Sequence, residues 1–110
     1  MGYDVALAER VRDVVKAEPG MTERRMFAGL AFLVHGNLAV SANSRGDLLL
    51  RTDPADAESL LREPHVRRFR MRGRELAGWL NVGVAALRTE EQLSRWVRHG
   101  IGYAASLPPK

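Results

Sequence analysis

RRMFAGLAFLVHGNLAVSAN, from Arg24 to Asn43, is the segment that decides how this chain folds. After Arg25 the sequence has no charged residue until Arg45. The uncharged run from Met26 to Ser44 has roughly the length of a transmembrane helix. This uncharged run therefore has three possible interpretations: a membrane span, the central strands of a sheet, or an exposed docking surface.

The centre of the run favours a sheet. The tripeptide His35-Gly36-Asn37 places turn-prone and polar residues where a bilayer tolerates them least. Two short apolar stretches, Leu30 to Val34 and Leu38 to Ala42, flank the tripeptide as strands flank the turn of a hairpin. Gly36 or Asn37 can adopt the positive φ that a tight reversal requires. We therefore predict a β-hairpin in water and no membrane segment.

The composition is that of a soluble globular protein. A chain of 110 residues with 45% apolar and 27% charged residues predicts a single domain spanning residues 1–110. It contains no cysteine, which excludes disulfides, thiolate metal sites and thiol catalysis. The first ten residues lack the basic start and apolar core of a secretory signal. These features together favour a cytoplasmic location.

The rest of the chain shows patterns for helices and further strands. We predict helices that begin near Asp4, at Asp53-Pro54 and at the capping box from Thr89 to Gln92, and strands at Thr22 to Phe27, Leu48 to Arg51, Val66 to Met71 and Leu76 to Val82. Gly29 suggests a bulge or bend before the hairpin. Gly100 and Gly102 are poor helix formers, so either another element packs closely there or the last turn is irregular.

The predicted fold class is α+β. An antiparallel sheet of about five strands, in the order α-β-β-β-α-β-β-α, has helices packed on one face, because strands joined by short turns pair antiparallel. The other face of the sheet then meets water or a second subunit.

Several ordered motifs resemble the TfoX N-terminal domain family, which is related to the Sxy regulators of bacterial natural transformation. They are MFAGLAFLVHGNLA at Met26 to Ala39, DLLLR at Asp47 to Arg51, EPHVRRF at Glu63 to Phe69, Gly78-Trp79, and the terminal WVRHGIGYAASLPPK. The structural motif residues that we take from this resemblance are Met26, Phe27, Gly29, Gly36 and Trp79. Ala28 stands where the family has the first glycine of a pair.

The resemblance implies a short, single-domain member of the family with a fold similar to the secretion-chaperone-like α+β domains. The two-domain regulators have a second, helical domain for which this sequence has no counterpart. The resemblance supplies no catalytic residues and no cofactor.

An arginine-rich segment is the strongest candidate for a binding site. From Arg62 to Arg74 the sequence has six arginines and one acid, Glu63, which is a larger positive surplus than the +4 of the whole chain. Guanidinium groups on one strand face, at roughly 7 Å spacing, are able to follow a phosphate backbone. The candidate nucleic-acid-binding residues are Arg67, Arg68, Arg70, Arg72 and Arg74.

The same segment has a plainer interpretation, which we favour at this stage. Alternation places Arg68, Arg70 and Arg72 on one strand face, with Phe69 and Met71 on the opposite, core-facing side. The arginines are then a solvated face that pairs with acids such as Asp56, Glu58 or Glu75. No aromatic side chain is interleaved with the arginines on that face, which disfavours binding of a single strand.

The sequence offers no assembled catalytic or metal site. His35, His65 and His99 have no second histidine or carboxylate at a recognised ligand spacing. There is no Gly-x-Ser-x-Gly elbow and no phosphate-binding glycine loop. We therefore expect no enzymatic activity, no metal and no cofactor.

The positions of the two tryptophans indicate whether the sheet has a face that could bind a partner protein. Trp96 falls on an apolar helix stripe with Leu93 and Val97, which predicts core packing. Trp79 precedes Leu80, which points to the opposite face of its strand, so that strand is either buried on both sides or meets a partner.

These features lead to a preferred function and two alternatives. We favour a non-enzymatic interaction domain that binds an unknown protein partner, or a second copy of itself, through its sheet. The first alternative is a nucleic-acid-associated regulator that uses the arginine strand, and the second is a small-molecule-binding domain.

Overall fold

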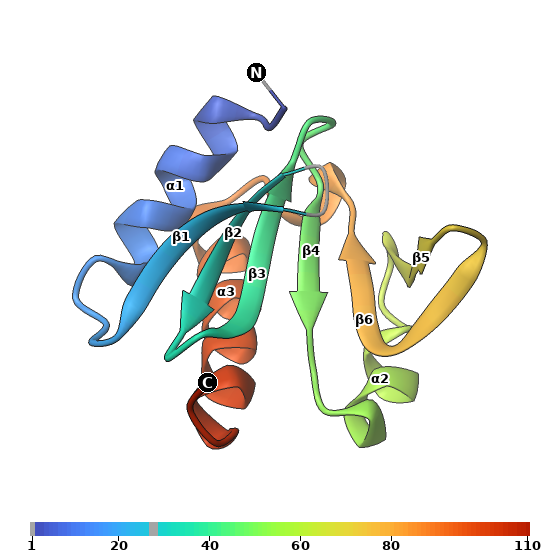
Figure 1. Cartoon of the computed structure of the whole chain (residues 1–110). Helices are drawn as coiled ribbons and strands as arrows, with labels where there is room; N and C mark the ends of the chain where they lie inside the picture. Colours follow the sequence, from blue (N-terminus) through green and yellow to red (C-terminus); the bar gives the residue numbers. More distant parts are fainter. Residues whose placement is uncertain (1, 27–28) are drawn as a thin grey trace.

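The computed structural model describes residues 2–26 and 29–110, so the predicted motif residue Phe27 lies outside the described residues. The elements follow the chain as α1 (Val5–Val15), β1 (Met21–Met26), β2 (Gly29–Val34), β3 (Asn37–Asn43), β4 (Leu48–Arg51), α2 (Pro54–Leu60), β5 (Val66–Met71), β6 (Arg74–Val82), the 3-10 helix η1 (Val84–Ala86) and α3 (Glu90–Ser106). Figure 1 shows their arrangement.

The strands form one antiparallel sheet in the order β1-β2-β3-β4-β6-β5 (Figure 1). The α+β class is confirmed, but the described part of the chain has six strands rather than about five, with four before α2. The ranges predicted for individual strands already number six, and the strand predicted at Thr22 to Phe27 is present as β1. Met26 pairs with Gly29, and β1 lies antiparallel beside β2.

The predicted hairpin is present between β2 and β3. Val34 pairs with Asn37, and the two residues between them, His35 and Gly36, have φ of 49° and 84°. Positive φ at both positions is the signature of a type I′ turn, whose twist matches that of the strands it joins. The turn is therefore centred on Gly36 as expected, with His35 rather than Asn37 as the second residue of positive φ. No described helix is long and apolar enough to cross a bilayer.

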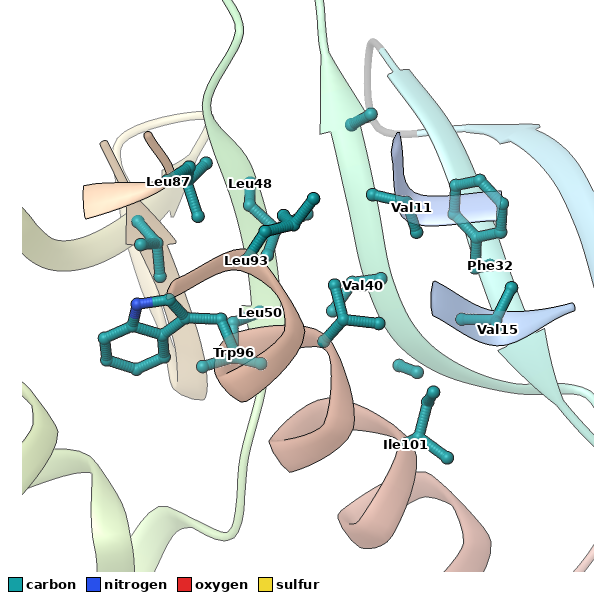
Figure 2. Packing of buried hydrophobic residues seen from close by; sticks show 14 of the residues in the cluster. Val11, Val15, Phe32, Val40, Leu48, Leu50, Leu87, Leu93, Trp96 and Ile101 are labelled. Carbon is teal, nitrogen blue, oxygen red and sulfur yellow. The ribbon is translucent and has the colours of Figure 1, made fainter. Parts of the chain in front are cut away.

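The main core lies between the sheet and two helices. Helix α3 packs across β2, β3 and β4, and α1 contacts α3 and β3. The largest buried side chains include Val11 and Val15 of α1, Phe32, Val40, Leu48 and Leu50 of the sheet, and Leu93, Trp96 and Ile101 of α3 (Figure 2). Trp96 is thus a core residue, as predicted. Helix α2 packs separately against β6.

Each helix begins where its capping residue predicts. The side chains of Asp4 and Asp53 accept hydrogen bonds from the backbone N–H of Leu7 and Ala55. At α3 the box is reciprocal, because Gln92 N–H donates to the Thr89 hydroxyl and Thr89 N–H donates to the Gln92 side chain.

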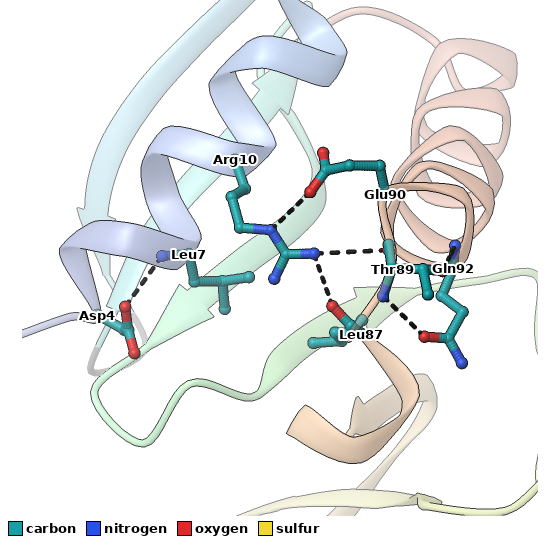
Figure 3. A network of polar contacts seen from close by, with 7 residues as sticks. All are labelled: Asp4, Leu7, Arg10, Leu87, Thr89, Glu90 and Gln92. Atoms are coloured by element: carbon teal, nitrogen blue, oxygen red, sulfur yellow. Dashed lines mark hydrogen bonds and ion pairs between the residues drawn. The ribbon is translucent and has the colours of Figure 1, made fainter.

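Arg10 ties α1 to the start of α3 (Figure 3). Its Nη2 donates to the Leu87 carbonyl at 2.7 Å and its Nε pairs with Glu90 at 3.0 Å. The two ends of the chain are therefore joined by polar contacts as well as by the core.

A second apolar cluster occupies the other face of the sheet. Successive residues of a strand point to opposite faces, so Ala31 and Leu33 face away from the core that Phe32 enters. Ala31, Leu33, Leu38 and Leu49 are all at most 6% exposed, and Met26, Phe69 and Trp79 are half-buried against them. Among the described residues, only Val5 and Val84 are large apolar side chains that are exposed.

Candidate functional site

The arginine-rich segment forms β5, the outermost strand of the sheet beyond β6. The pairing of the two strands is irregular: Arg68 pairs with Leu80, but Arg70 already pairs with Glu75, so the register shifts between the two arginines. At the end of the strand, Arg72 has φ of 52° and belongs to the turn. Simple alternation therefore fails along this strand.

The structure refines the predicted placement of Phe69 and Met71. We expected both to point away from the arginines, into the core. In the structure both line the same cleft as Arg67, Arg68, Arg70 and Arg72, although Phe69 also packs against Trp79. Phe69 packs against the second apolar cluster, as expected of a core-facing residue, and lines the cleft as well.

The cleft has a volume of about 900 Å³ and a strongly positive lining. It is formed by the turn after β3, by β5 with its following turn, and by two positions of β6: Asn43, Ser44, Arg45, Arg67, Arg68, Phe69, Arg70, Met71, Arg72, Glu75 and Asn81. Five arginines and one glutamate give the lining a surplus of four positive charges.

Ion pairs neutralise part of this charge. Arg68 pairs with Glu58 of α2, and Arg70 pairs with Glu75 at 3.0 Å, as the solvated-face interpretation predicted for these two acids. Arg67 lies 3.8 Å from Asp47. These pairs are largely exposed to solvent and so are weak.

Two of the arginines that line the cleft remain unpaired within the described residues. Within residues 2–26 and 29–110, neither Arg45 nor Arg72 makes an ion pair, and Asp56 makes none with the arginines. Arg74 is exposed beyond the cleft, on the far side of the turn. The surplus therefore persists after pairing, because the acids near the cleft are fewer than its arginines.

Asp47 fixes the wall of the cleft that faces β5. It is 9% exposed, its Oδ1 accepts from Val84 N–H at 3.1 Å, and its Oδ2 accepts from Asn81 Nδ2 at 3.3 Å. The Asn43 side chain accepts from the N–H groups of both Arg45 and Asp47, which closes the turn. Sequence reasoning missed Asn43, Arg45 and Asn81, since nothing in the local sequence signals that this turn lies beside β5.

The histidines occupy three separate places. His35 is in the hairpin turn, His65 has φ of 66° and accepts from Gly83 N–H through its carbonyl, and His99 Nε2 lies 2.7 Å from the Thr52 hydroxyl. In the described part of the chain, no group of three or more metal-ligating side chains comes together.

Two ion pairs outside the cleft shift the pKa of their acids. Arg95 donates to both carboxylate oxygens of Glu63, at 2.7 and 2.5 Å, and these hydrogen bonds hold the pKa of Glu63 below its usual value. Hydrogen bonds from Arg12 lower the pKa of Glu23 in the same way. Both pairs join an N-terminal or C-terminal helix to the rest of the fold and are remote from the arginine cleft.

A family model for the TfoX N-terminal domain matches residues 13–104. The chain belongs to the TfoX N-terminal domain family. In the corresponding comparisons with curated proteins and with solved structures, nothing matches. The TfoX N-terminal domain is a regulatory type of domain, and the whole arginine cleft falls inside the matched residues.

The motif positions of this TfoX N-terminal domain have structural uses. A Cβ on Gly29 would lie 2.4 Å from the Ala42 carbonyl oxygen, so only glycine permits the close approach of β2 to β3. Gly36 forms the hairpin turn, Met26 packs in the second apolar cluster, and Trp79 stacks on Phe69 with ring centroids 6.1 Å apart. These glycines and aromatic residues shape the sheet on which the cleft is built.

Proposed function

We propose that this TfoX N-terminal domain is a non-enzymatic regulatory domain that associates with nucleic acid through the arginine cleft. The observation that supports this proposal is a concave surface lined by five arginines and one glutamate. Arginine presents a planar, permanently charged fork that matches phosphate oxygens in pairs. The binding residues are Arg45, Arg67, Arg68, Arg70 and Arg72, with Arg74 beside them.

We place nucleic-acid binding before protein binding, which reverses the order that the sequence alone favoured, and the reason is physical. Protein binding through the free face of the sheet requires exposed apolar surface. The apolar residues of that face, Ala31, Leu33, Leu38 and Leu49, are already buried within one protomer. The exposed feature of this side of the molecule is charge, and charge is what a polyanion recognises.

The test is fluorescence anisotropy of labelled DNA oligonucleotides at a series of salt concentrations. Counterion release predicts that the logarithm of the affinity falls linearly with the logarithm of salt. Arg67→Ala and Arg72→Ala are each expected to lower the slope by about one, because each removes a single phosphate contact. These two arginines are chosen because, within the described residues, Arg72 makes no ion pair and Arg67 makes only the 3.8 Å pair with Asp47.

Arg98→Ala is the matched control. Arg98 is exposed on α3, outside the cleft, and its described contact is a hydrogen bond from Nε to the Ser94 hydroxyl. The Arg98→Ala variant loses the same charge as the cleft variants, so the salt dependence of its DNA binding is expected to match that of the wild type. Undetectable binding of DNA at low salt, or equal losses in all three variants, would contradict a site at the cleft.

A second candidate function is self-association through β1. This strand is the other edge of the open sheet, has only β2 as a neighbour, and exposes Thr22 to Arg25. An unpaired edge presents backbone N–H and C=O groups to a second strand. Light scattering tests this candidate: a concentration-dependent dimer that Arg24→Pro abolishes is expected, and a monomer at all concentrations excludes it.

A further inference from the structure

We infer that the arginine cleft takes single-stranded nucleic acid, with an unpaired base stacked on Phe69. This inference rests on the proposed function and names the form of nucleic acid that the site recognises. It starts from the lining of the cleft, in which the aromatic residue Phe69 stands between arginines of β5. A positive groove combined with an aromatic surface is the general design of sites for single strands.

The Phe69 ring is half-buried and well supported. It stacks on Trp79 at 6.1 Å between centroids with 28° between the ring planes, and it packs with Trp79 against the second apolar cluster. The Arg51 guanidinium lies over the Trp79 ring, 5.7 Å from its centroid. A ring held this firmly loses little conformational freedom when a base stacks on it.

The charges along β5 lie on both sides of this ring. Arg67 and Arg68 precede Phe69 in the strand, and Arg70 and Arg72 follow it, all as lining residues of one cleft. A strand rises about 3.3 Å per residue, so Arg67 and Arg70 are roughly 10 Å apart along β5, and Arg72 follows in the turn. A base on Phe69 thus has arginines within reach of the phosphates that precede and follow it.

The size of the cleft also favours a single strand. A volume of about 900 Å³ lies within the range of sites that enclose small ligands, which is the scale of one or two nucleotides. The bases of a duplex are stacked and paired and cannot reach a ring inside such a cleft, whereas those of a single strand can be splayed out. A duplex would reach only those arginines that lie at the edge of the cleft.

An acidic peptide would satisfy the same arginines, and the aromatic ring is what distinguishes the two ligands. Carboxylates need no stacking surface, whereas every nucleobase has a face that stacks on Phe69. Nucleic acid therefore uses both components of the lining. A peptide uses only the charges.

The experiment compares a labelled single-stranded oligonucleotide with a duplex of the same sequence, using wild type, Phe69→Leu and Phe69→Tyr. We expect the single strand to bind more tightly, Phe69→Leu to weaken it roughly five- to hundredfold, and Phe69→Tyr to restore it. The salt slope should be the same in all three proteins, because none of these changes alters a charge. A poly-glutamate peptide serves as competitor.

A fluorescence readout covers the case in which Phe69→Leu does not fold. A base stacked against Phe69 lies next to its partner Trp79, so the single strand should quench tryptophan emission in the wild type and much less in Trp79→Phe. Thermal unfolding checks the fold of each variant.

The outcomes separate the two proposals. Equal affinity for single strand and duplex, or full affinity of a folded Phe69→Leu, overturns the stacking inference but leaves nucleic-acid association intact. No binding of either form overturns both. Displacement by poly-glutamate at lower concentrations than by unlabelled DNA would reassign the cleft to an acidic protein.

Discussion

Gly100 of α3 lies so close to Ala39 of β3 that a Cβ added to the glycine would come within 2.6 Å of the Ala39 carbonyl oxygen. The obstacle is backbone, which cannot rotate away as a side chain can. Gly102, two residues further along the same helix, has no atom within 4 Å of such a Cβ. The sequence left open whether another element packs closely against these two glycines. It does so at Gly100 and not at Gly102.

Gly100→Ala is therefore expected to destabilise the protein by about 1–3 kcal/mol, because overpacking forces α3 away from the sheet. Gly102→Ala is the matched control and is expected to stabilise by up to about 1 kcal/mol, since alanine is the better helix former. Urea unfolding at equilibrium measures both. Equal effects of the two substitutions would show that α3 does not press on Ala39.

The capping box gives a second prediction. Thr89→Ala removes the acceptor for Gln92 N–H and is expected to cost about 1 kcal/mol of unfolding free energy. Gln92→Glu keeps an acceptor for Thr89 N–H and adds a negative charge in the first turn of α3, so it should cost nothing. Thermal denaturation followed by circular dichroism distinguishes the two. A loss for Gln92→Glu as large as for Thr89→Ala would contradict the reciprocal box.

A third prediction concerns pH. Arg95 lowers the folded-state pKa of Glu63, so the pair contributes stability above the usual carboxylate pKa, and this contribution is lost as pH falls through the folded value. Because Arg95 is 54% exposed and Glu63 33%, the contribution at neutral pH is at most about 1 kcal/mol. Glu63→Gln should thus destabilise at pH 7 and approach the wild type in acid.

Glu18→Gln is the control for that experiment. Glu18 is exposed in the turn after α1 and makes no ion pair within the described residues. Its stability difference from the wild type is expected to stay near zero in denaturant titrations across the same pH range. A Glu63→Gln deficit that is independent of pH would rule out the ion pair as its cause.

Asp47 provides a fourth prediction, at the wall of the cleft. Asp47→Asn leaves one acceptor where the carboxylate receives both Val84 N–H and Asn81 Nδ2, and it sets two amide groups against each other. We expect a loss of about 1–3 kcal/mol in unfolding free energy, because a buried donor goes unpaired. Asp56→Asn, at an exposed position of α2, is the control. Equal stability of both variants would show that the Asp47 contacts are not structural.

The local elements of this chain follow from local chemistry. Asp4, Asp53 and Thr89 begin the three helices because their side chains satisfy backbone N–H groups only a few residues away. The apolar runs beside Gly36 form a hairpin because the turn needs positive φ that glycine adopts without strain. The family resemblance rested on these same short motifs, and the family match agrees with it.

The cleft was decided by contacts that no local pattern contains. One register shift between Arg68 and Arg70 interrupts the strict alternation on which strand predictions depend, and Phe69 lines the same cleft as the arginines. The turn at Asn43 to Arg45 and β5 line one cleft although they are distant in sequence, and the strand order β3-β4-β6-β5 that arranges them is set by pairing across the whole chain. Sequence thus determined the elements and the basic charge, whereas long-range strand pairing decided which side chains share one surface.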